Sequence, residues 1–380
     1  MVRTIKKDFT RRQFTPRVAP APHTVSQLSP STRLRACLPA STADRYIGLE
    51  DEQLARVMEK AFAPSTLEGY GCGLGHFLDW CEAHSIAEEE CCPASEELLC
   101  RFVASRAGSY SGDSISKMVS AIGAWHKWHG HRWNFQPKSR LTLALRGAAA
   151  MTPASSRRPP REPYTTAYLR ALRAHFNLSV PRDAAVWACA LCAFWGLLRV
   201  GEAIVPTQKT YSPEMHISRS GWVHQQVPPH VHAAASASAA LRLPWTKTTR
   251  AAGAVVVLTA RMDDLCPVTA VLLHLAVSPL PAASPLFAFS RAGRSSPLSR
   301  SMFLARLKTA ATAAGLPHLH GHSFRIGGCT ELLLQGAAIE DVKAHGRWRS
   351  DAWTVYVRDH VTIFSSRLAP APTVRRQLVG

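Results

Sequence analysis

The sequence predicts a mainly α-helical protein with a small antiparallel β-sheet, divided into two domains. Three observations support this fold class. The chain has 380 residues, which is longer than one average domain. Apolar residues make up 46% of it, enough for a sizeable core. Apolar side chains recur at helical three- and four-residue steps through most of the chain, and strand-like segments occur only in its second half.

The charge is strongly positive. Lys and Arg number 45 against 26 Asp and Glu, a formal net charge of +19. Such an excess predicts a polyanionic partner, nucleic acid before membrane. No apolar run approaches the roughly 20 residues of a membrane span, and no secretory signal is recognisable. The ten cysteines are therefore expected as buried, reduced thiols.

Residues 1–47 are expected to form a disordered basic arm. Residues 1–35 contain eight Lys or Arg and a single acid, Asp8. This arm would contact DNA phosphates or serve as a targeting address. An organelle transit peptide is the second interpretation, because such peptides are also rich in Arg and poor in acids.

Residues 48–151 are expected to form a helical domain. Helices are predicted over about 61–84, 95–106, 113–130 and 139–151, and no segment here alternates with the period of a strand. Four helices of this length form a bundle.

Residues 152–162 are the predicted linker. The stretch TPASSRRPPREP is dense in proline and arginine, and proline at this density breaks helices and stiffens an extended path. Residues 163–367 should form the second domain, followed by a tail at 368–380. In it, two strands near 241–246 and 255–259 flank a polar turn. The stretch 211–232, rich in Pro, His and Gln, is expected to be an irregular insertion.

Metal and nucleotide sites are not expected. Cys189 and Cys192 form a CxxC inside an apolar helix without a second pair, so core thiols are the favoured interpretation. A Walker loop and an HExxH motif are absent, which disfavours a nucleotide cofactor and a metalloprotease site. Two groups of histidines are close in sequence but too weak as patterns to predict a metal: His224, His230 and His232, and His318, His320 and His322.

Six polar and aromatic residues of the second half form a more specific constellation. They lie in the segments WGLLRVGEA, LPWTKTTR, GHSFRIGGCT and GRWRSDAWTVYVR. Taken singly, each has a structural explanation: a helix-end or turn charge, a helix cap, or a core aromatic. Their order and mutual context favour a shared function. The six are Arg199, Lys247, His322, Arg325, Trp348 and Tyr356.

This order resembles the catalytic signature of the tyrosine recombinase, or phage integrase, family: Arg, a hairpin Lys, His-x-x-Arg, then His or Trp, then the nucleophilic Tyr. The resemblance covers about residues 165–365, and the helical region before it looks like the family's core-binding domain. The amino-acid sequence of the last segment is most similar to recombinases of eukaryotic mobile elements, of the Crypton and tyrosine-recombinase retrotransposon kinds. Two departures from many bacterial members are Trp348 in place of His and Ile326 with two glycines after Arg325.

The resemblance implies a helical core-binding domain followed by an α+β catalytic domain that cuts and rejoins DNA. Tyr356 would attack a phosphodiester and form a 3′-phosphotyrosyl link. Arg199 and Arg325 would stabilise the phosphate oxygens. Lys247 would protonate the leaving 5′-oxygen, and His322 would move a proton.

Trp348 would donate its indole N–H to the phosphate. Glu202 would hold a basic residue in place, or would simply be a surface acid. The implied partners are double-stranded DNA and further copies of the chain, a tetramer on paired sites, with no cofactor and no membrane. The implied location is the nucleus, with an organelle as the second choice. The alternatives are a catalytically silent DNA-binding derivative and a DNA-relaxing enzyme resembling type IB topoisomerases.

Overall fold

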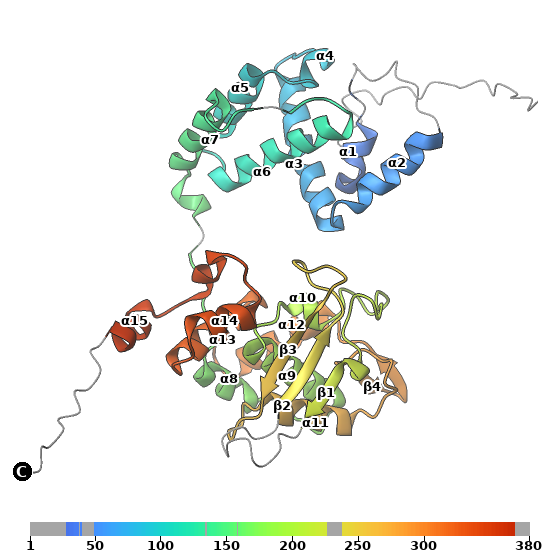
Figure 1. The fold of residues 1–380 in the computed structure, drawn as a ribbon, viewed down its shortest axis with the longest axis vertical. Helices are drawn as coiled ribbons and strands as arrows, with labels where there is room; N and C mark the ends of the chain where they lie inside the picture. The colour runs from blue at the N-terminus through green and yellow to red at the C-terminus, as the bar shows by residue number, and fades with distance from the viewer. Residues whose placement is uncertain are drawn as a thin grey trace, which may run out of the picture. The chain divides into compact units, whose positions relative to one another are not determined.

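The computed structural model consists of two compact units, Met1–Pro159 and Pro160–Gly380. Both are built mainly of helices, and the second also holds small antiparallel sheets (Figure 1). The predicted fold class is therefore confirmed. The structure describes residues 28–37, 39, 49–133, 135–157, 159–225 and 238–368. Within these ranges no helix has the length and apolar character that crossing a membrane requires. The predicted tail at 368–380 lies almost wholly outside them.

The first unit is a helical bundle. Three of its helices begin where a serine side chain accepts a hydrogen bond from the backbone N–H three residues on, namely at Ser95, Ser111 and Ser139. Phe77 and Phe102 are fully buried in its core. The helices are α2 (Leu49–Lys60), α3 (Pro64–Ala83), α4 (Glu88–Cys91), α5 (Glu96–Arg106), α6 (Gly112–Trp128) and α7 (Arg140–Ala150), followed by the 3₁₀ turn η4 (Ala154–Ser156).

Part of the expected basic arm packs into this unit. The short helices η2 (Pro30–Thr32) and α1 (Arg33–Ala36) lie against α3. Leu34 is buried, and the Trp125 indole donates to the Cys37 carbonyl at 2.7 Å. The expectation of disorder is therefore wrong for residues 28–37, because their apolar side chains complete the core. The other residues of the predicted arm, apart from Pro39, lie outside the described ranges.

The second unit is organised around one buried helix. Every residue of α9 from Asp183 to Trp195 is buried, and α11 and α13 pack against this helix. The helices are α8 (Thr166–Arg173), α9 (Pro181–Trp195), α10 (Val200–Ala203), α11 (Pro267–Val277), α12 (Arg300–Ala313), α13 (His322–Leu334), α14 (Ile339–Gly346) and α15 (His360–Leu368). The 3₁₀ turns are η5 (Arg219–Gly221) and η6 (Asp351–Tyr356).

A three-stranded antiparallel sheet covers part of this core. Its order is β1 (Trp222–Gln225), β2 (Ser238–Leu243) and β3 (Ala254–Thr259). The strand β1 corrects the expectation that 211–232 is wholly irregular: Trp222 is buried and pairs with Leu241. A strand this short, ending in His224 and a glutamine, has too few apolar residues to show alternation. A separate hairpin joins β4 (Phe289–Arg291) to β5 (Arg294–Ser296).

Two glycines let α13 lie directly on its neighbours. A Cβ at Gly327 would stand 1.8 Å from the carbonyl oxygen of Tyr164, and one at Gly328 would stand 1.9 Å from that of Phe194. No side chain fits at either position. The glycines that follow Arg325 are thus required by packing, and they fix the depth at which that arginine lies in the unit.

Candidate active site

Arg325 is a fully buried arginine on the first turns of α13. Its two Nη nitrogens donate to the carbonyls of Leu197 and Gly346, so it joins the end of α9 to the end of α14. Burial, followed by the charges of Arg199 and Arg347, lowers its pKa to about 10. It still carries its positive charge at neutral pH.

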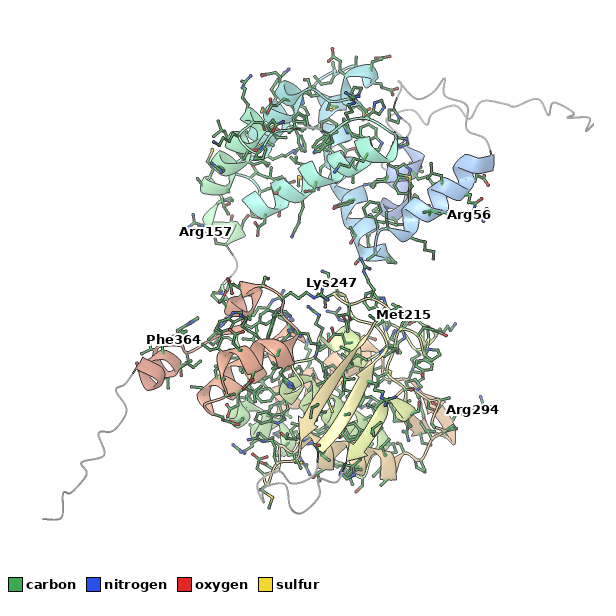
Figure 2. All side chains as sticks on the ribbon, viewed as in Figure 1. Arg56, Arg157, Met215, Lys247, Arg294 and Phe364 are labelled. Carbon is green, nitrogen blue, oxygen red and sulfur yellow. The ribbon has the colours of Figure 1, made fainter. Side chains whose placement is uncertain are left out.

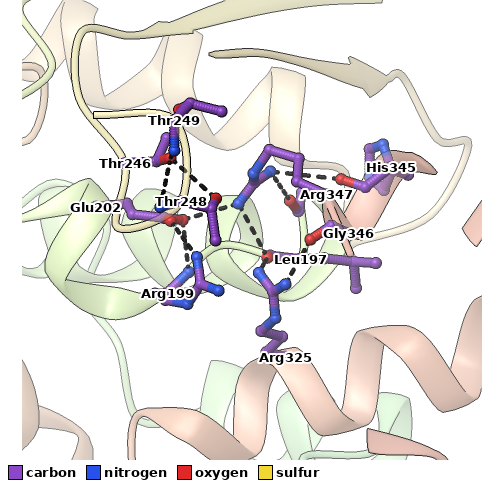
Figure 3. Close-up of polar contacts among 11 residues, drawn as sticks. Leu197, Arg199, Glu202, Thr246, Thr248, Thr249, Arg325, His345, Gly346 and Arg347 are labelled. Carbon is purple, nitrogen blue, oxygen red and sulfur yellow. Dashed lines mark hydrogen bonds and ion pairs between the residues drawn. The ribbon is translucent and has the colours of Figure 1, made fainter. Parts of the chain in front are cut away.

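Arg199 stands at the start of α10 and pairs with Glu202 one turn later. Its Nη1 lies 2.8 Å from Glu202 Oε1, and its backbone N–H donates to Oε2 at 2.9 Å. Glu202 is buried, and the same Oε2 accepts from Arg347 Nη2 at 2.8 Å. One buried carboxylate therefore holds two arginines (Figure 3). This answers the question left open by the sequence, because Glu202 is not a surface acid.

Three aromatic rings from separate segments meet beside Arg325. The Tyr356 ring lies 5.0 Å from the Trp348 ring and 4.9 Å from the His322 ring, between centroids. The guanidinium of Arg325 lies over both the Trp348 and the Tyr356 rings, 4.3 Å and 5.2 Å from their centroids. Four of the six predicted residues are thus in one cluster. Arg199 joins it through Glu202 and Arg347.

Lys247 stands apart from this cluster. It lies exposed in the turn between β2 and β3 (Figure 2), where its side chain makes no hydrogen bond or ion pair with any described residue. The turn itself is ordered: buried Thr246 accepts from the backbone N–H groups of Thr248 and Thr249 at 3.3 Å and 3.0 Å. The predicted hairpin placement is found, but the structure shows no contact between Lys247 and the other five residues.

The cluster has more positive charge and more hydrogen-bond donors than its own acceptors can satisfy. Glu202 pairs directly with Arg199 and Arg347, while Arg325 has no ion-pair partner among the described residues. The Nε groups of Arg325 and Arg347 and the indole Nε1 of Trp348 are buried and have no hydrogen-bond partner among the described residues. Unpaired N–H donors and unbalanced positive charge suit an anion with several acceptor oxygens, such as a phosphate.

The His322 ring is kept neutral. Burial is the first cause of its lowered pKa, and the nearby charges of Arg161 and Arg325 add to it. Since the usual value is 6.5, the lowered pKa makes the imidazole a proton acceptor at neutral pH.

Arg347 is the residue of this site that sequence reasoning missed. It stands between Gly346 and Trp348, where the pattern offers no sign that its side chain is buried. The signal becomes visible only in three dimensions, through its ion pair with Glu202.

Elsewhere, Cys189 and Cys192 lie fully buried in α9, where burial raises the pKa of both thiols. Among the described residues no three His, Cys, Asp or Glu side chains are grouped in a way that could hold a metal ion. Of the predicted histidine groups, His230 and His232 lie outside the described ranges.

Comparison with known proteins gives one sequence match and several structural ones. A protein of Selenomonas ruminantium described as an integrase/recombinase xerD homolog is 32% identical over 71 residues, 19% of this chain and 20% of that protein. The chain thus matches about a fifth of that relative's length. No family model matches the chain.

Among solved structures, the XerH site-specific recombinase bound to palindromic difH substrate, in a post-cleavage complex, is similar with a TM-score of 0.52 and 11% identity over 91% of this chain and 92% of that one. A pre-cleavage complex of XerH has a TM-score of 0.49 at 13% identity, covering 91% of this chain and 92% of that chain. The chain therefore shares the fold of the XerH recombinase, and its match to the xerD homolog is confined to 71 residues.

Proposed function

We propose that this protein cleaves and rejoins DNA strands in site-specific recombination, through a covalent 3′-phosphotyrosyl intermediate on Tyr356. The observation that carries the proposal is the position of the Tyr356 ring, packed against His322 and Trp348 and beside the guanidinium of Arg325. Tyr356 also packs against a small apolar cluster, but a tyrosine that served only the core would not lie beside a buried cation. This one lies in a cluster with excess positive charge.

In the cleavage step, the Tyr356 oxygen forms a bond to phosphorus and the bond from phosphorus to the 5′-oxygen breaks. The neutral His322 ring, 4.9 Å from the Tyr356 ring between centroids, would accept the phenolic proton. Rejoining reverses the step, with a 5′-hydroxyl as nucleophile and Tyr356 as leaving group. The phosphotyrosyl bond conserves the energy of the broken one, so no nucleotide is consumed.

The remaining residues stabilise charge. Arg199 and Arg325 would bind the non-bridging oxygens, where negative charge grows in the transition state. The free Trp348 Nε1 would donate a further hydrogen bond. Lys247, exposed on its turn, would enter the site when DNA is bound and protonate the 5′-oxygen, since catalytic contacts often tighten only with substrate.

The wider proposal concerns partners and setting. The net charge of +19 supports double-stranded DNA as the substrate, and the structurally similar XerH is described as bound to its difH substrate. Recombination joins two sites, so we propose a multimer, a tetramer on paired sites. A role in a eukaryotic mobile element and a nuclear location complete the proposal. A helical DNA-binding domain over 48–151, a linker at 152–162 and a catalytic domain over 163–367 remain its predicted layout.

Covalent trapping on nicked DNA tests the function. The full chain is incubated with labelled nicked duplexes whose core sequence is randomised, and the products are separated on a denaturing gel. We expect a covalent band with the wild-type chain and none with Tyr356→Phe, which loses only the hydroxyl. Tyr211→Phe, which removes the hydroxyl that donates to the Ala283 carbonyl, is the matched control and should retain the band.

The outcomes separate the alternatives. DNA binding by mobility shift without a covalent band would identify a silent DNA-binding derivative. Relaxation of supercoiled plasmid by the chain alone, without joining of paired sites, would identify a topoisomerase-like enzyme. A covalent band that persists in the Tyr356→Phe variant would show that the nucleophile is assigned wrongly.

A further inference from the structure

Arg347 has a backbone conformation that is unfavourable for an arginine. It ends α14 with φ 60° and ψ 37°, in the left-handed region that favours glycine. Leu197, which follows α9, also has a positive φ, of 48°. Non-glycine residues held in this region cost of the order of 1 kcal/mol and persist where the surroundings require them. Leu197 lies two residues before Arg199, and Arg347 is itself an arginine of the site, so both conformations occur at the candidate site.

The Arg347 side chain is largely buried, and both of its Nη groups donate to its own unit. Only 10% of it is exposed, and its Nη2 donates to Glu202 Oε2 at 2.8 Å and to the Leu197 carbonyl at 3.4 Å. Its Nη1 contacts the carbonyls of Gly196 and His345 at 3.5 Å and 3.4 Å. Unlike that of Arg325, its charge is neutralised by direct pairing with the Glu202 carboxylate, so Arg347 is not arranged to bind a phosphate directly.

The two groups that Arg347 holds are the ones that hold Arg199 and Arg325. Glu202 Oε1 accepts from Arg199 Nη1 at 2.8 Å, and the Leu197 carbonyl accepts from Arg325 Nη1. By contrast, the Nε and Nη2 of Arg199 make no hydrogen bond with a described residue, and 27% of that side chain is exposed. Arg199 therefore keeps donors free for an anion while one of its Nη groups is fixed.

We propose that Arg347 is a positioning residue, which fixes the Glu202 carboxylate and the Leu197 carbonyl and thereby aligns Arg199 and Arg325 as one anion-binding unit. The proposal rests on the function proposed above and adds to it a residue that never touches the DNA. Loss of the Arg347 side chain would leave Glu202 with Arg199 as its one ion-pair partner among the described residues, free to follow that arginine's motion. Misalignment of about 1 Å is enough to slow a reaction about 100-fold.

Arg347→Gly is the informative variant, because glycine suits the left-handed backbone and only the side chain is lost. On nicked DNA, we expect the rate of covalent product formation at saturating DNA to fall about 10- to 100-fold. The DNA concentration that gives half of the maximal rate should change by less than about threefold, since Arg347 does not bind DNA. Arg347→Lys should recover part of the rate, because lysine keeps the positive charge but lacks the planar guanidinium that donates several hydrogen bonds at once. Arg294→Ala, the loss of an exposed arginine on β5, is the matched control and should react at the wild-type rate.

A double-mutant cycle distinguishes positioning from simple stabilisation. If Arg347 acts through Glu202, the losses caused by Arg347→Gly and Glu202→Gln should not add. The cleavage rate of the double variant should then be within about twofold of that of the slower single variant. Additive losses, or a wild-type rate in Arg347→Gly at equal folded fraction, would overturn the proposal.

A second measurement does not depend on DNA cleavage. The Nε–H resonance of Arg199, assigned by its loss in Arg199→Lys, reports the order of that side chain in the full protein by NMR. We expect an ordered resonance in the wild type that broadens or averages in Arg347→Gly. If the wild-type chain forms no covalent product, the proposed function fails, while this resonance still decides the positioning role: an unchanged signal in Arg347→Gly would refute it.

Discussion

The guanidinium carbon of Arg325 lies 4.3 Å from the centre of the Trp348 ring. The arginine is fully buried, so this cation–π contact is desolvated and worth on the order of 2 kcal/mol. The face of the indole is thus used for the arginine, while its Nε1 is buried without a partner. Trp348 has two separable parts: a face that holds the Arg325 cation and an N–H that has no acceptor among the described residues.

Trp348→Phe separates these two parts. Phenylalanine keeps an aromatic face for Arg325 and removes the N–H, so we expect the melting temperature to change by only a few degrees. If the N–H binds the phosphate, the rate of covalent cleavage should fall about 10-fold, the value of one hydrogen bond of about 1.4 kcal/mol. Trp348→Ala should in addition destabilise the unit by roughly 3 kcal/mol. Cleavage by Trp348→Phe at the wild-type rate would show that the indole contributes only packing and donates no hydrogen bond to the phosphate.

The general-acid role of Lys247 is tested by the leaving group. Lys247→Ala should slow cleavage of ordinary nicked DNA by roughly 10²- to 10⁴-fold, the usual contribution of a general acid. DNA whose leaving 5′-oxygen is replaced by sulfur should restore the rate, because a thiolate departs without protonation. Arg325→Ala serves as the control, since loss of charge stabilisation is not rescued by sulfur. A Lys247→Ala deficit that persists on the sulfur substrate would assign the lysine to DNA binding instead.

The sequence predicted some features of this molecule well and others poorly, for physical reasons. Long helices such as α3 and α6 have enough periodic residues to be recognised, and their ends agree with the predicted ones within about three residues. The four residues of β1 are too few for alternation to show. Residues 30–36 have a basic composition, and only the burial of Leu34 in three dimensions reveals that they are structured.

The candidate site shows the same division. The order and context of the motif segments singled out the six residues, and five of them meet in one network. The sequence did not decide whether Glu202 holds a basic residue, and it gave no sign that Arg347 belongs to the site. The two residues are 145 positions apart in the chain, and their contact exists only in the folded protein. The side chain of Lys247 depends on a ligand for its final position, which neither the sequence nor the structure of the chain alone contains.

The glycines of α13 and α7 give opposite expectations for one substitution. A Cβ at Gly328 would stand 1.9 Å from the Phe194 carbonyl oxygen, so Gly328→Ala should destabilise the second unit by about 3 kcal/mol or more. Gly147, inside α7, has nothing within 4 Å of its added Cβ, so Gly147→Ala should stabilise the first unit by up to about 1 kcal/mol. Calorimetric scans of the full chain check both shifts. A harmless Gly328→Ala would mean that α13 does not lie directly on α9.

Buried histidines should make the first unit sensitive to acid, with His126 as the sharpest case. Its ring is 1% exposed, its Nδ1–H donates to the Ile122 carbonyl at 2.8 Å, and its Nε2 accepts from the Ala94 N–H at 2.8 Å. A second ring proton would face that N–H without an acceptor. Burial is the main cause of the lowered pKa, about 4 in the folded chain against 6.5 in the unfolded one.

The direction of the effect follows from these two pKa values. Between pH 6.5 and about 4, His126 is protonated in the unfolded chain but not in the folded one. The contribution to the free energy of unfolding that is present above pH 6.5 is therefore lost as the pH falls through this window. At about 1.4 kcal/mol per pKa unit, the loss is on the order of 3 kcal/mol by pH 4.

His126→Gln, which cannot titrate, should be less stable at pH 7.5 and show a shallower decline toward acid. His84→Gln is the matched control, since His84 makes the same contact with the carbonyl four residues before it from an exposed position. Thermal melting followed by circular dichroism between pH 7.5 and 4 gives both slopes; equal slopes for His126→Gln and the wild type would show that His126 does not titrate between the folded and unfolded states.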